Sequence, residues 1–480
     1  MKQMSGRRIP LGRTRSSRIA LLALLATAAF CAMAGSAFGM KTPHVYIVGP
    51  GVHPTPPPNT SYSPTIQAAV NSTKKGDWVL LEPGTYTEQV KVPKAHGGIH
   101  IRGLDRNTVI LDGQHQKGDG IFVEGANNVW IENMTAHDYD GNEFWWAGGE
   151  ESKRQNVHGW VGKYLTAYQT DLGGVYGIFT QNMREGSWEH VYASGFNDAG
   201  LYLGACWDCQ AKISDATIEN NAVGYSGSNS GGRLVIEKST FRNNSAGIVP
   251  NGENPGDGPP PQNGVCGAHR PRSPYYLFPS TAIAHCTVLK ENLVTENNNL
   301  TVPATASTDK APWGVGVELP GDMGDLVENN TITKNVNNGV LGFEYPNPFP
   351  PTPETIYFQF TGNKVANNTF AENGTSGLEF ASDITFQGGI YPHGKYTSAN
   401  DCVTGNKTTG AVYPLALDTT WNCSNATTPP PNNGLAGIGY VVILSEQAGA
   451  LRTPEVQPAP GPQPTMPEPC EGVPANPLCP

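Results

Sequence analysis

Hydrophobic and polar positions along most of the chain follow a short repeat rather than a helical period. An apolar residue is followed three places later by a polar one, usually asparagine, and a glycine then precedes another apolar residue. The leading apolar residues are Met134, Leu165, Val191, Ile218, Phe241, Val294, Ile332 and Phe370. Short β-branched runs broken by glycine and asparagine are typical of strands joined by turns. The repeat predicts a solenoid, in which each coil buries its inner side chains against its neighbours.

The spacing of the repeat indicates the size of a coil. Successive leading residues are 31, 26, 27, 23, 53, 38 and 38 positions apart. The shortest spacing is about one β-helix coil, and the longer ones are coils that carry loops, or two coils. Two Pro-rich insertions, 251–282 and 344–354, are expected to overhang one face. We predict an all-β, single-stranded right-handed parallel β-helix over residues 40–452, followed by a Pro-rich tail, 453–480, that is extended or weakly ordered.

The N-terminal region differs from the repeats. Residues 1–39 combine a basic start, an apolar run and small closing residues, which is typical of a secretory signal peptide. A short helix from about Pro64 to Asn71 is expected to cap the open end of the solenoid, because an uncapped end exposes core and strand edge. The strand Trp78–Leu81 and the turn Pro83-Gly84 then begin the first coil.

Charge and cysteine content narrow the class of protein. Six of the 31 basic residues lie in the signal segment, which leaves 25 against 41 acidic residues, a formal charge of −16. This balance argues against a nucleic-acid partner, and no later apolar stretch is long enough to span a membrane. Eight cysteines remain, an even number that in an exported chain predicts disulfides between sequence neighbours. They are Cys206, Cys209, Cys266, Cys286, Cys402, Cys423, Cys470 and Cys479. We expect a secreted or cell-surface protein.

Two stretches resemble known families. Ile66-Gln67-Ala68-Ala69, Gly76-Asp77 and Pro83-Gly84-Thr85-Tyr86 with Glu88 resemble the first coil of pectin methylesterases and other members of the pectate-lyase-like superfamily. The middle of the chain (GLYLGACWDCQ, GYSGSNSGG and GIVPN) resembles exported bacterial β-helix-repeat proteins. The resemblance implies the fold but not one activity, because this fold hosts lyases, hydrolases, esterases, epimerases and adhesins. The aspartate motifs of pectin methylesterases and most polygalacturonase blocks are absent, so neither activity is expected.

Aspartates on the early coils are candidates for chemistry. With Met134, Leu165 and Val191 aligned, an aspartate follows six or seven residues later on each coil. These aspartates are Asp140, Asp171 and Asp198. Stacked carboxylates about 4.8 Å apart repel one another unless one is protonated or a cation lies between them. The column predicts a cation site, with Ca²⁺ as the candidate cofactor, or acid–base work on a glycosidic bond; an aspartate before glycine is also an ordinary turn residue.

The resemblance to lyases of this fold adds a candidate base. Those lyases use Ca²⁺ together with an arginine or lysine, which here implies Arg233 or Lys212 acting with Asp171 and Asp198. His137 lies beside the aspartates as a further base or ligand candidate, although a lone histidine is more often an ordinary surface residue.

Aromatic and asparagine residues complete the candidates. Exposed aromatic rings can hold sugar rings, whereas alternate ones must lie in the core. The candidate platforms are Trp145, Trp146, Tyr168 and Trp207. A column of asparagines is expected to form a structural amide ladder. Its members are Asn221, Asn244, Asn297, Asn335 and Asn373.

These observations predict a secreted β-helix protein that acts on or binds polysaccharide, with a lyase-like reaction on acidic glycans as the leading hypothesis. The alternative is a non-catalytic glycan-binding or adhesion protein of the cell surface. A metal-handling role is disfavoured because histidine and methionine are sparse and unclustered.

Overall fold

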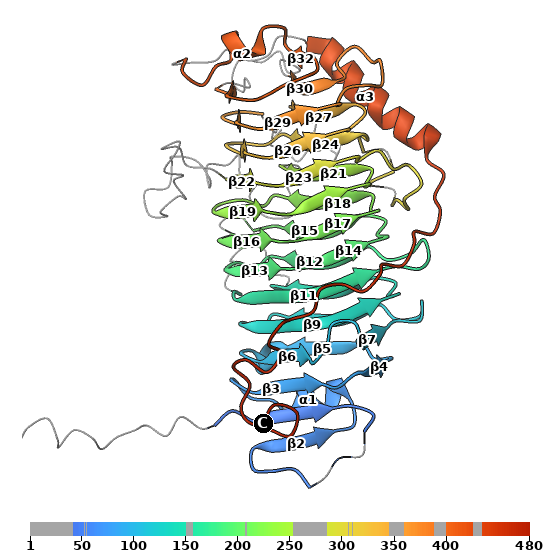
Figure 1. Ribbon diagram of the computed structural model, residues 1–480, viewed down its shortest axis with the longest axis vertical. Helices are drawn as coiled ribbons and strands as arrows, with labels where there is room; N and C mark the ends of the chain where they lie inside the picture. The colour runs from blue at the N-terminus through green and yellow to red at the C-terminus, as the bar shows by residue number, and fades with distance from the viewer. Residues whose placement is uncertain are drawn as a thin grey trace, which may run out of the picture. The chain divides into compact units, whose positions relative to one another are not determined.

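The chain winds as a single-stranded right-handed parallel β-helix with three strands per coil, which confirms the predicted fold class (Figure 1). The computed structural model describes residues 42–51, 53, 55–149, 157–206, 209–252, 286–305, 307–309, 311–344, 360–387, 400–425 and 434–480. One compact unit extends from Pro43 to Pro480. The predicted signal peptide and most of both Pro-rich insertions lie outside the described residues.

Three walls of parallel strands enclose the core. The first and second walls belong to one 21-stranded sheet, because the long strands β9 (Val129–His137) and β11 (Trp160–Tyr168) run through both. The other strands of the first wall are β2 (Thr60–Ser63), β1 (Val45–Val48), β3 (Trp78–Leu81), β6 (His100–Gly103), β13 (Gly186–Glu189), β16 (Ala211–Ser214), β19 (Leu234–Glu237), β22 (Thr287–Lys290), β25 (Leu326–Glu328), β28 (Lys364–Ala366) and β31 (Cys402–Thr404). Those of the second wall are β4 (Gly84–Tyr86), β7 (Val109–Asp112), β14 (Tyr192–Ser194), β17 (Thr217–Glu219), β20 (Thr240–Arg242), β23 (Leu293–Thr295), β26 (Thr331–Thr333) and β29 (Thr369–Ala371).

The third wall is a separate 11-stranded sheet. Its strands are β5 (Val90–Pro93), β8 (Asp119–Glu124), β10 (Asn142–Ala147), β12 (Tyr176–Gln181), β15 (Ala199–Gly204), β18 (Val223–Ser228), β21 (Ala246–Asn251), β24 (Val315–Pro320), β27 (Asn338–Phe343), β30 (Ser382–Gln387) and β32 (Val412–Tyr413). Glycine faces inward near the start of many of these strands. A Cβ added to Gly224 would lie 2.5 Å from the carbonyl oxygen of Gly247 on the next coil, so the column has no room for a side chain there.

The register shows that each long spacing of the repeat is one coil with a loop. Phe241 pairs directly with Val294, although 53 residues separate them. The predicted alignment slips at one point, since Ile218 pairs with Ala193 rather than with Val191. On both sides of that slip the leading residues face the core.

Amide ladders line the corners between the walls. The predicted ladder is confirmed: each Nδ2 donates to the Oδ1 of the next coil, as from Asn244 to Asn297 at 3.0 Å. Its other steps are Asn221 to Asn244, Asn297 to Asn335 and Asn335 to Asn373. A second ladder, whose asparagines also recur along the repeats, consists of Asn292, Asn330, Asn368 and Asn406. A third is shorter and mixed, and its members are Asp325, Asn363 and Asp401.

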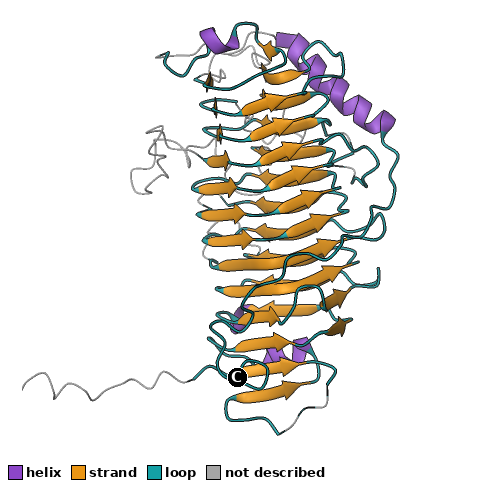
Figure 2. Ribbon diagram, viewed as in Figure 1, coloured by secondary structure: helices purple, strands orange, loops and turns teal. Residues whose placement is uncertain are grey.

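Helices lie at the ends of the solenoid (Figure 2). The N-terminal cap is α1 (Ile66–Ser72), where the side chain of Thr65 accepts a hydrogen bond from the Ala68 amide, and a 3₁₀ turn covers Lys94–His96. The predicted start of the first coil at Trp78 was too late, because β1 already pairs with both β2 and β3.

The C-terminal end differs from the prediction of β-helix as far as residue 452. The last coil closes with β32 and α2 (Leu417–Thr420), and α3 (Gly434–Leu451) then packs on the outside of the third wall. Tyr440 and Leu444 of α3 are buried against Leu341 and Phe343 of that wall. No described helix has the length and apolar character that crossing a membrane requires.

Residues 453–480, which we call the strap, run from α3 back across the outside of earlier coils to the N-terminal end (Figure 1). Of the two alternatives predicted for this segment, extended or weakly ordered, the structure shows the first, since the strap has no helix or strand and side chains of the solenoid bind its backbone. Arg106 Nη1 donates to the carbonyl of Pro464 at 3.0 Å, and Arg102 Nη1 donates to those of Pro469 and Glu471 at 3.0 and 2.7 Å. A Pro-rich chain has carbonyl acceptors without internal partners, and buried guanidinium groups supply the donors.

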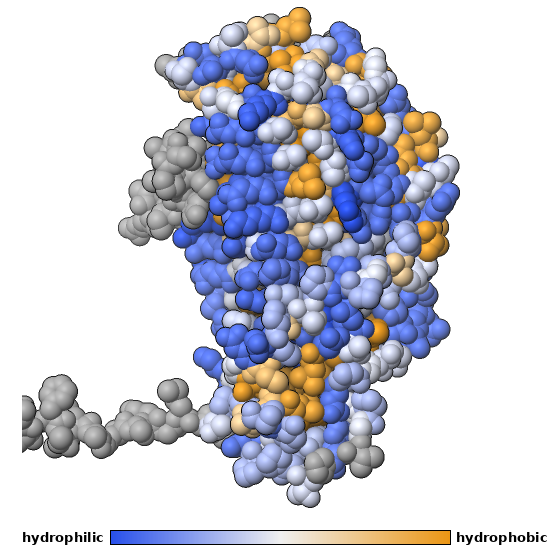
Figure 3. Space-filling view, viewed as in Figure 1, coloured by the Kyte–Doolittle hydropathy of each residue, from blue (hydrophilic) through white to orange (hydrophobic). Residues whose placement is uncertain are grey.

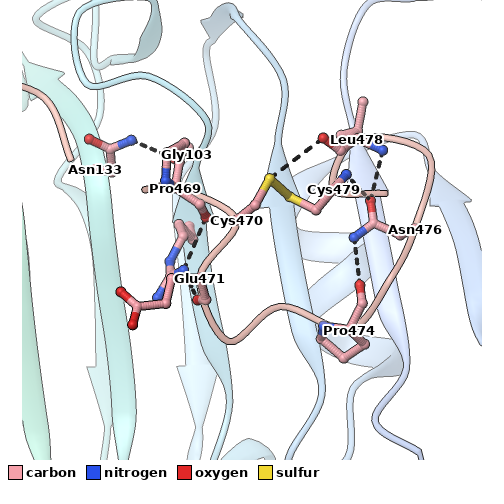
Figure 4. The surroundings of a disulfide bond; sticks show 10 residues. Gly103, Asn133, Pro469, Cys470, Glu471, Pro474, Asn476, Leu478 and Cys479 are labelled. Atoms are coloured by element: carbon pink, nitrogen blue, oxygen red, sulfur yellow. Dashed lines mark hydrogen bonds between the residues drawn. A yellow bond between two sulfur atoms is a disulfide. The ribbon is translucent and has the colours of Figure 1, made fainter. Parts of the chain in front are cut away.

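Three of the four predicted disulfides are present, linking Cys206 to Cys209, Cys402 to Cys423 and Cys470 to Cys479. The fourth involves Cys266, which lies outside the described residues. The third closes the loop that ends the strap (Figure 4). Cys479 and Leu478 pack into an apolar cluster with Val45 and Ile47 of β1, and apolar surface gathers at this end of the solenoid (Figure 3).

Candidate functional site

Three outward side chains of the second wall lie in one column. Asp112 of β7 pairs with His137 of β9, and His137 pairs with Tyr168 of β11. They point outward because their predecessors in each strand, Leu111, Ala136 and Ala167, are fully buried in the core. The rings of His137 and Tyr168 stack with centroids 4.8 Å apart.

Asp138 orients this histidine. It begins the turn after β9 with φ of 61°, and its Oδ2 lies 2.8 Å from Nδ1 of His137. The backbone amide and the hydroxyl of Thr170 donate to its Oδ1 at 2.7 and 2.9 Å. Burial alone would raise the pKa of Asp138, but the hydrogen bonds from His137 and Thr170 outweigh burial and lower the pKa.

A second histidine approaches Asp138 from the preceding coil. His115 Nε2 lies 3.3 Å from the Thr170 hydroxyl and 3.6 Å from Asp138 Oδ2. Its Nδ1 lies 2.9 Å from Oδ2 of Asp171, so one of the predicted aspartates belongs to this group. We call the group the dyad site; its members are Asp112, His115, His137, Asp138, Tyr168, Thr170 and Asp171.

The arrangement suits proton transfer. An ionised carboxylate can only accept, so the proton between Asp138 and His137 lies on Nδ1, and Nε2 is the open acceptor. This is how an enzyme orients an imidazole that serves as a general base or acid. Burial, followed by the charges of Asp138 and Asp112, raises the pKa of Tyr168 to about 12, so its hydroxyl keeps its proton.

The same atoms could hold a cation. Oδ1 of Asp112, Nδ1 of His137 and Oδ2 of Asp138 all lie within 4.8 Å of one another, and no other such trio of His, Cys, Asp or Glu occurs in the described part of the chain. A set that includes an imidazole suits a transition metal better than Ca²⁺, which takes oxygen ligands. The predicted Ca²⁺ cofactor therefore does not fit these donors.

The predicted column of Asp140, Asp171 and Asp198 does not form. Counted back from the paired strands β10, β12 and β15, Asp198 is level with Val175 and Gly141. The turn 169–175 is longer than the turns 138–141 and 195–198 on its neighbours, and it carries Asp171 out of register. Asp140 is exposed, and Asp198 accepts a hydrogen bond from Ser307 at 3.2 Å.

Lys212 and Arg233 lie together, but on the first wall. They line a shallow hollow with Glu237 that contains neither Asp171 nor Asp198. Glu237 lies 2.8 Å from Lys212 Nζ, and this hydrogen-bonded ion pair raises the pKa of Lys212. A lysine held in its charged form is a poor base. Because the hollow does not include Asp171 or Asp198, the predicted combination of these aspartates with Lys212 or Arg233 is not assembled.

The predicted aromatic platforms have different outcomes. Trp146 is fully buried, and its indole N–H donates to Val129, so it is a core residue. Trp145 points outward on the third wall, but both faces are covered, by Phe122 at 4.2 Å and Phe179 at 5.2 Å. Tyr168 is in the dyad site, and Trp207 lies outside the described residues.

Sequence reasoning missed Asp112, His115 and Asp138. A signal was present, because the pairs Asp112-Gly113 and His137-Asp138 stand at the ends of second-wall strands and Thr170-Asp171 lies in the turn directly after another. Finding them required the register of β7, β9 and β11, which the unequal loops hide.

Fold and site together define a right-handed parallel β-helix protein with a histidine–carboxylate dyad on the outside of its second wall. A family model described as "Protein of unknown function (DUF1565)" matches residues 301–427, which lie beyond the dyad site. No curated protein matches the chain.

Solved structures share the fold at low identity. The A-module of mannuronan C-5 epimerase AlgE4 from Azotobacter vinelandii is 12% identical, with a TM-score of 0.44 over 71% of this chain and 90% of that one. An alginate lyase from Paenibacillus is 13% identical, with a TM-score of 0.36 over 73% and 92% of the two chains. Pectate lyase Pel9A is 12% identical, with a TM-score of 0.37 over 70% and 77%. These likenesses concern the fold alone.

Proposed function

We propose that this chain is an extracellular polysaccharide-acting protein and that the dyad site transfers a proton to or from a bound sugar. The observation that carries the proposal is the contact of 2.8 Å between His137 and Asp138 on the outside of the second wall, with Tyr168 stacked on the imidazole. An oriented imidazole beside an aromatic ring combines a proton acceptor with a surface for the C–H face of a sugar.

The stacking of Tyr168 on His137 supports a sugar subsite, because it places an outward aromatic side chain directly beside the oriented imidazole. A wall of parallel strands is also a long, open surface, which suits a linear polymer better than a compact metabolite.

For an acidic glycan the reaction would be an elimination. His137 Nε2 takes the proton on the carbon next to the uronate carboxylate, a carbon–carbon double bond forms, and the glycosidic C–O bond breaks. The leaving oxygen takes a proton from the Tyr168 hydroxyl, which its raised pKa keeps protonated. Asp112, Asp138 and Asp171 repel a uronate, so added Ca²⁺ as a counter-ion is one arm of the test.

The test is incubation with a panel of polyuronides and neutral polysaccharides, with and without Ca²⁺. Absorbance of unsaturated products and loss of polymer size are followed. We expect product from at least one polymer and a fall of roughly 100-fold in rate for His137→Asn, the range for loss of a general base. The matched control is His158→Asn, because His158 faces Glu185 at 3.6 Å on the first-wall side, away from the dyad site.

Two outcomes contradict the proposal: no product from any polymer, or equal rates for His137→Asn and the unaltered protein. Binding of a polymer without turnover, weakened by Tyr168→Leu, would favour the alternative of a glycan-binding or adhesion protein.

The extracellular location rests on the three disulfides among the described residues, since such bonds persist in oxidising compartments. Thiol labelling of protein recovered from the culture medium tests it. We expect Cys402, Cys423, Cys470 and Cys479 to be labelled only after reduction.

A further inference from the structure

The strap leaves a hollow of about 530 Å³ between itself and the first wall. The solenoid side of the hollow includes Trp130, Lys163, Tyr164, Glu189 and His190, and the strap side runs from Met466 to Gly472. The volume is in the range of small-molecule sites. It is separate from the dyad site, which lies on the outside of the second wall near its other edge.

The floor of the hollow is a column of alternating charge. Arg102, Glu132, Lys163 and Glu189 occupy equivalent outward positions on successive strands β6, β9, β11 and β13. Arg102 and Glu132 are buried partners 2.9 Å apart, and Arg102 also holds the strap, so this pair is fully engaged. Lys163 and Glu189 lie 3.2 Å apart and remain about one-third exposed, so both can also bind a ligand.

One side of the hollow is aromatic and rigid. Tyr164 and His190 stack with centroids 4.6 Å apart at the corner that follows the first wall. Both have left-handed backbones, with φ of 52° and 56°, which turn the two side chains outward at equivalent places on adjacent coils. A pair of stacked rings at a corner offers an edge and a polar tip to whatever occupies the hollow.

The opposite side is fixed by the strap. The backbone amide of Met466 and the hydroxyl of Thr465 both donate to Asn133 Oδ1 at 2.8 Å. Asn133 is fully buried, so this anchor sets the distance between strap and wall. The hollow is therefore a built space whose width depends on specific hydrogen bonds.

The charges of the lining exclude one class of ligand. Two basic side chains, Arg102 and Lys163, stand against four acidic ones, Glu132, Glu189, Glu468 and Glu471, an excess of two negative charges. This potential repels a polyanion. Mixed donors and acceptors beside the edges of aromatic rings match the hydroxyl groups of a pyranose.

We propose that the hollow under the strap is a second glycan site, which binds pyranose units that carry no acidic group. The site does not require the dyad chemistry. In a protein that acts on a long polymer it would hold a segment of chain away from the reacting bond.

Isothermal calorimetry tests the proposal with four probes: cello-oligosaccharides, chitin oligosaccharides, chitosan oligosaccharides and oligogalacturonate. We expect binding of at least one of the first three and none of oligogalacturonate at this site. Comparing the affinities of cello- and chitin oligosaccharides with that of chitosan oligosaccharides distinguishes uncharged sugars from sugars that carry a free amino group.

Matched variants locate the site. Lys163→Met should weaken binding about 10-fold, the equivalent of one lost hydrogen bond to a charged group, and Tyr164→Asn should do the same while tolerating the left-handed backbone. Lys212→Met is the control, since Lys212 has the same wall, the same kind of glutamate partner and a place outside the hollow.

The proposal is overturned if Lys163→Met and Tyr164→Asn weaken the binding of oligogalacturonate as much as that of the uncharged oligosaccharides, if none of the first three probes binds, or if Lys163→Met and Tyr164→Asn behave like Lys212→Met. Unaltered thermal unfolding midpoints would show that the variants are folded. These readouts are affinities, so they are independent of whether the dyad site turns over any polymer.

Discussion

The third ladder contains two carboxylates, Asp325 and Asp401, where the other ladders have amides, and Asp325→Asn tests the effect of the first on stability. Asp325 is buried between coils; its Oδ1 accepts from the Thr287 amide at 3.0 Å, and its own amide donates to Asn363 Oδ1 at 2.9 Å. Oδ2 is buried without a hydrogen-bond partner among the described residues. In the complete ladders that position is an Nδ2, which donates to the next Oδ1.

Burial raises the pKa of Asp325 to about 7, although hydrogen bonds from Thr287 oppose the change. The unfolded chain loses the same proton near pH 4. Below about pH 4 both states hold the proton and there is no penalty. Between about pH 4 and pH 7 only the folded state holds it, so the free energy of unfolding falls as the pH rises, and above about pH 7 the loss is constant. A difference of about three units is worth roughly 4 kcal/mol as an upper bound.

The amide variant removes this titration and adds a donor facing Asn363. We expect Asp325→Asn to unfold at a higher temperature than the unaltered protein at about pH 8, with the difference shrinking steadily toward about pH 4. Scanning calorimetry across that range measures it. The converse control is Asn330→Asp, which places a carboxylate where Asn330 Nδ2 now donates to Leu289 O and Asn368 Oδ1, and which should destabilise more as the pH rises. A gain for Asp325→Asn that is the same at every pH, or a loss at about pH 8, would refute the reasoning.

Three further predictions concern packing, the strap and acid stability. Gly224→Val should cost about 3 kcal/mol or more, because its Cβ would lie 2.5 Å from Gly247 O; chemical unfolding checks this, and an unchanged midpoint contradicts it. Replacing Cys470 and Cys479 by serine removes a bond that closes a short loop, worth about 3 kcal/mol, so limited proteolysis should cut the strap first while circular dichroism of the solenoid stays the same. The lowered pKa of Asp138 means that its stabilising effect is present above about pH 4 and is lost on further acidification, so Asp138→Asn should flatten stability against pH in that acid range.

The sequence predicted the fold because a short local pattern of residues determines each coil of the solenoid. Each coil repeats an inward apolar residue, an asparagine and a glycine, so Asn244 and Asn297 could be assigned to one ladder across a 53-residue spacing. The strand at Trp78–Leu81 and the helix near Ile66 also followed from local pattern. The strand β1 did not, because it precedes its partners β2 and β3 and has no repeat motif.

The candidate site was harder to predict because it depends on register across turns of unequal length. Asp171 was found, but it was grouped with Asp140 and Asp198 rather than with His115, since the turn 169–175 contains extra residues. His137 was named as a candidate base or ligand but not joined to a partner, because nothing in the sequence places Asp138 at hydrogen-bond distance from its ring. The strap was missed for a related reason: no local pattern shows that Arg102 will bind a carbonyl 369 residues away.

That long-range contact bears on how the molecule comes apart. Solenoids lose coils most readily from their ends, where a terminal repeat has one neighbour instead of two. Here the strap, with Arg106 and Asn133 as its anchors, runs from the end of α3 to the first coils and ends against β1. Fraying from the N-terminal end must first detach the strap from the wall. The resulting barrier lowers the rate of unfolding more than it raises the equilibrium free energy of unfolding. Such kinetic stability is of use to a protein exposed to proteases.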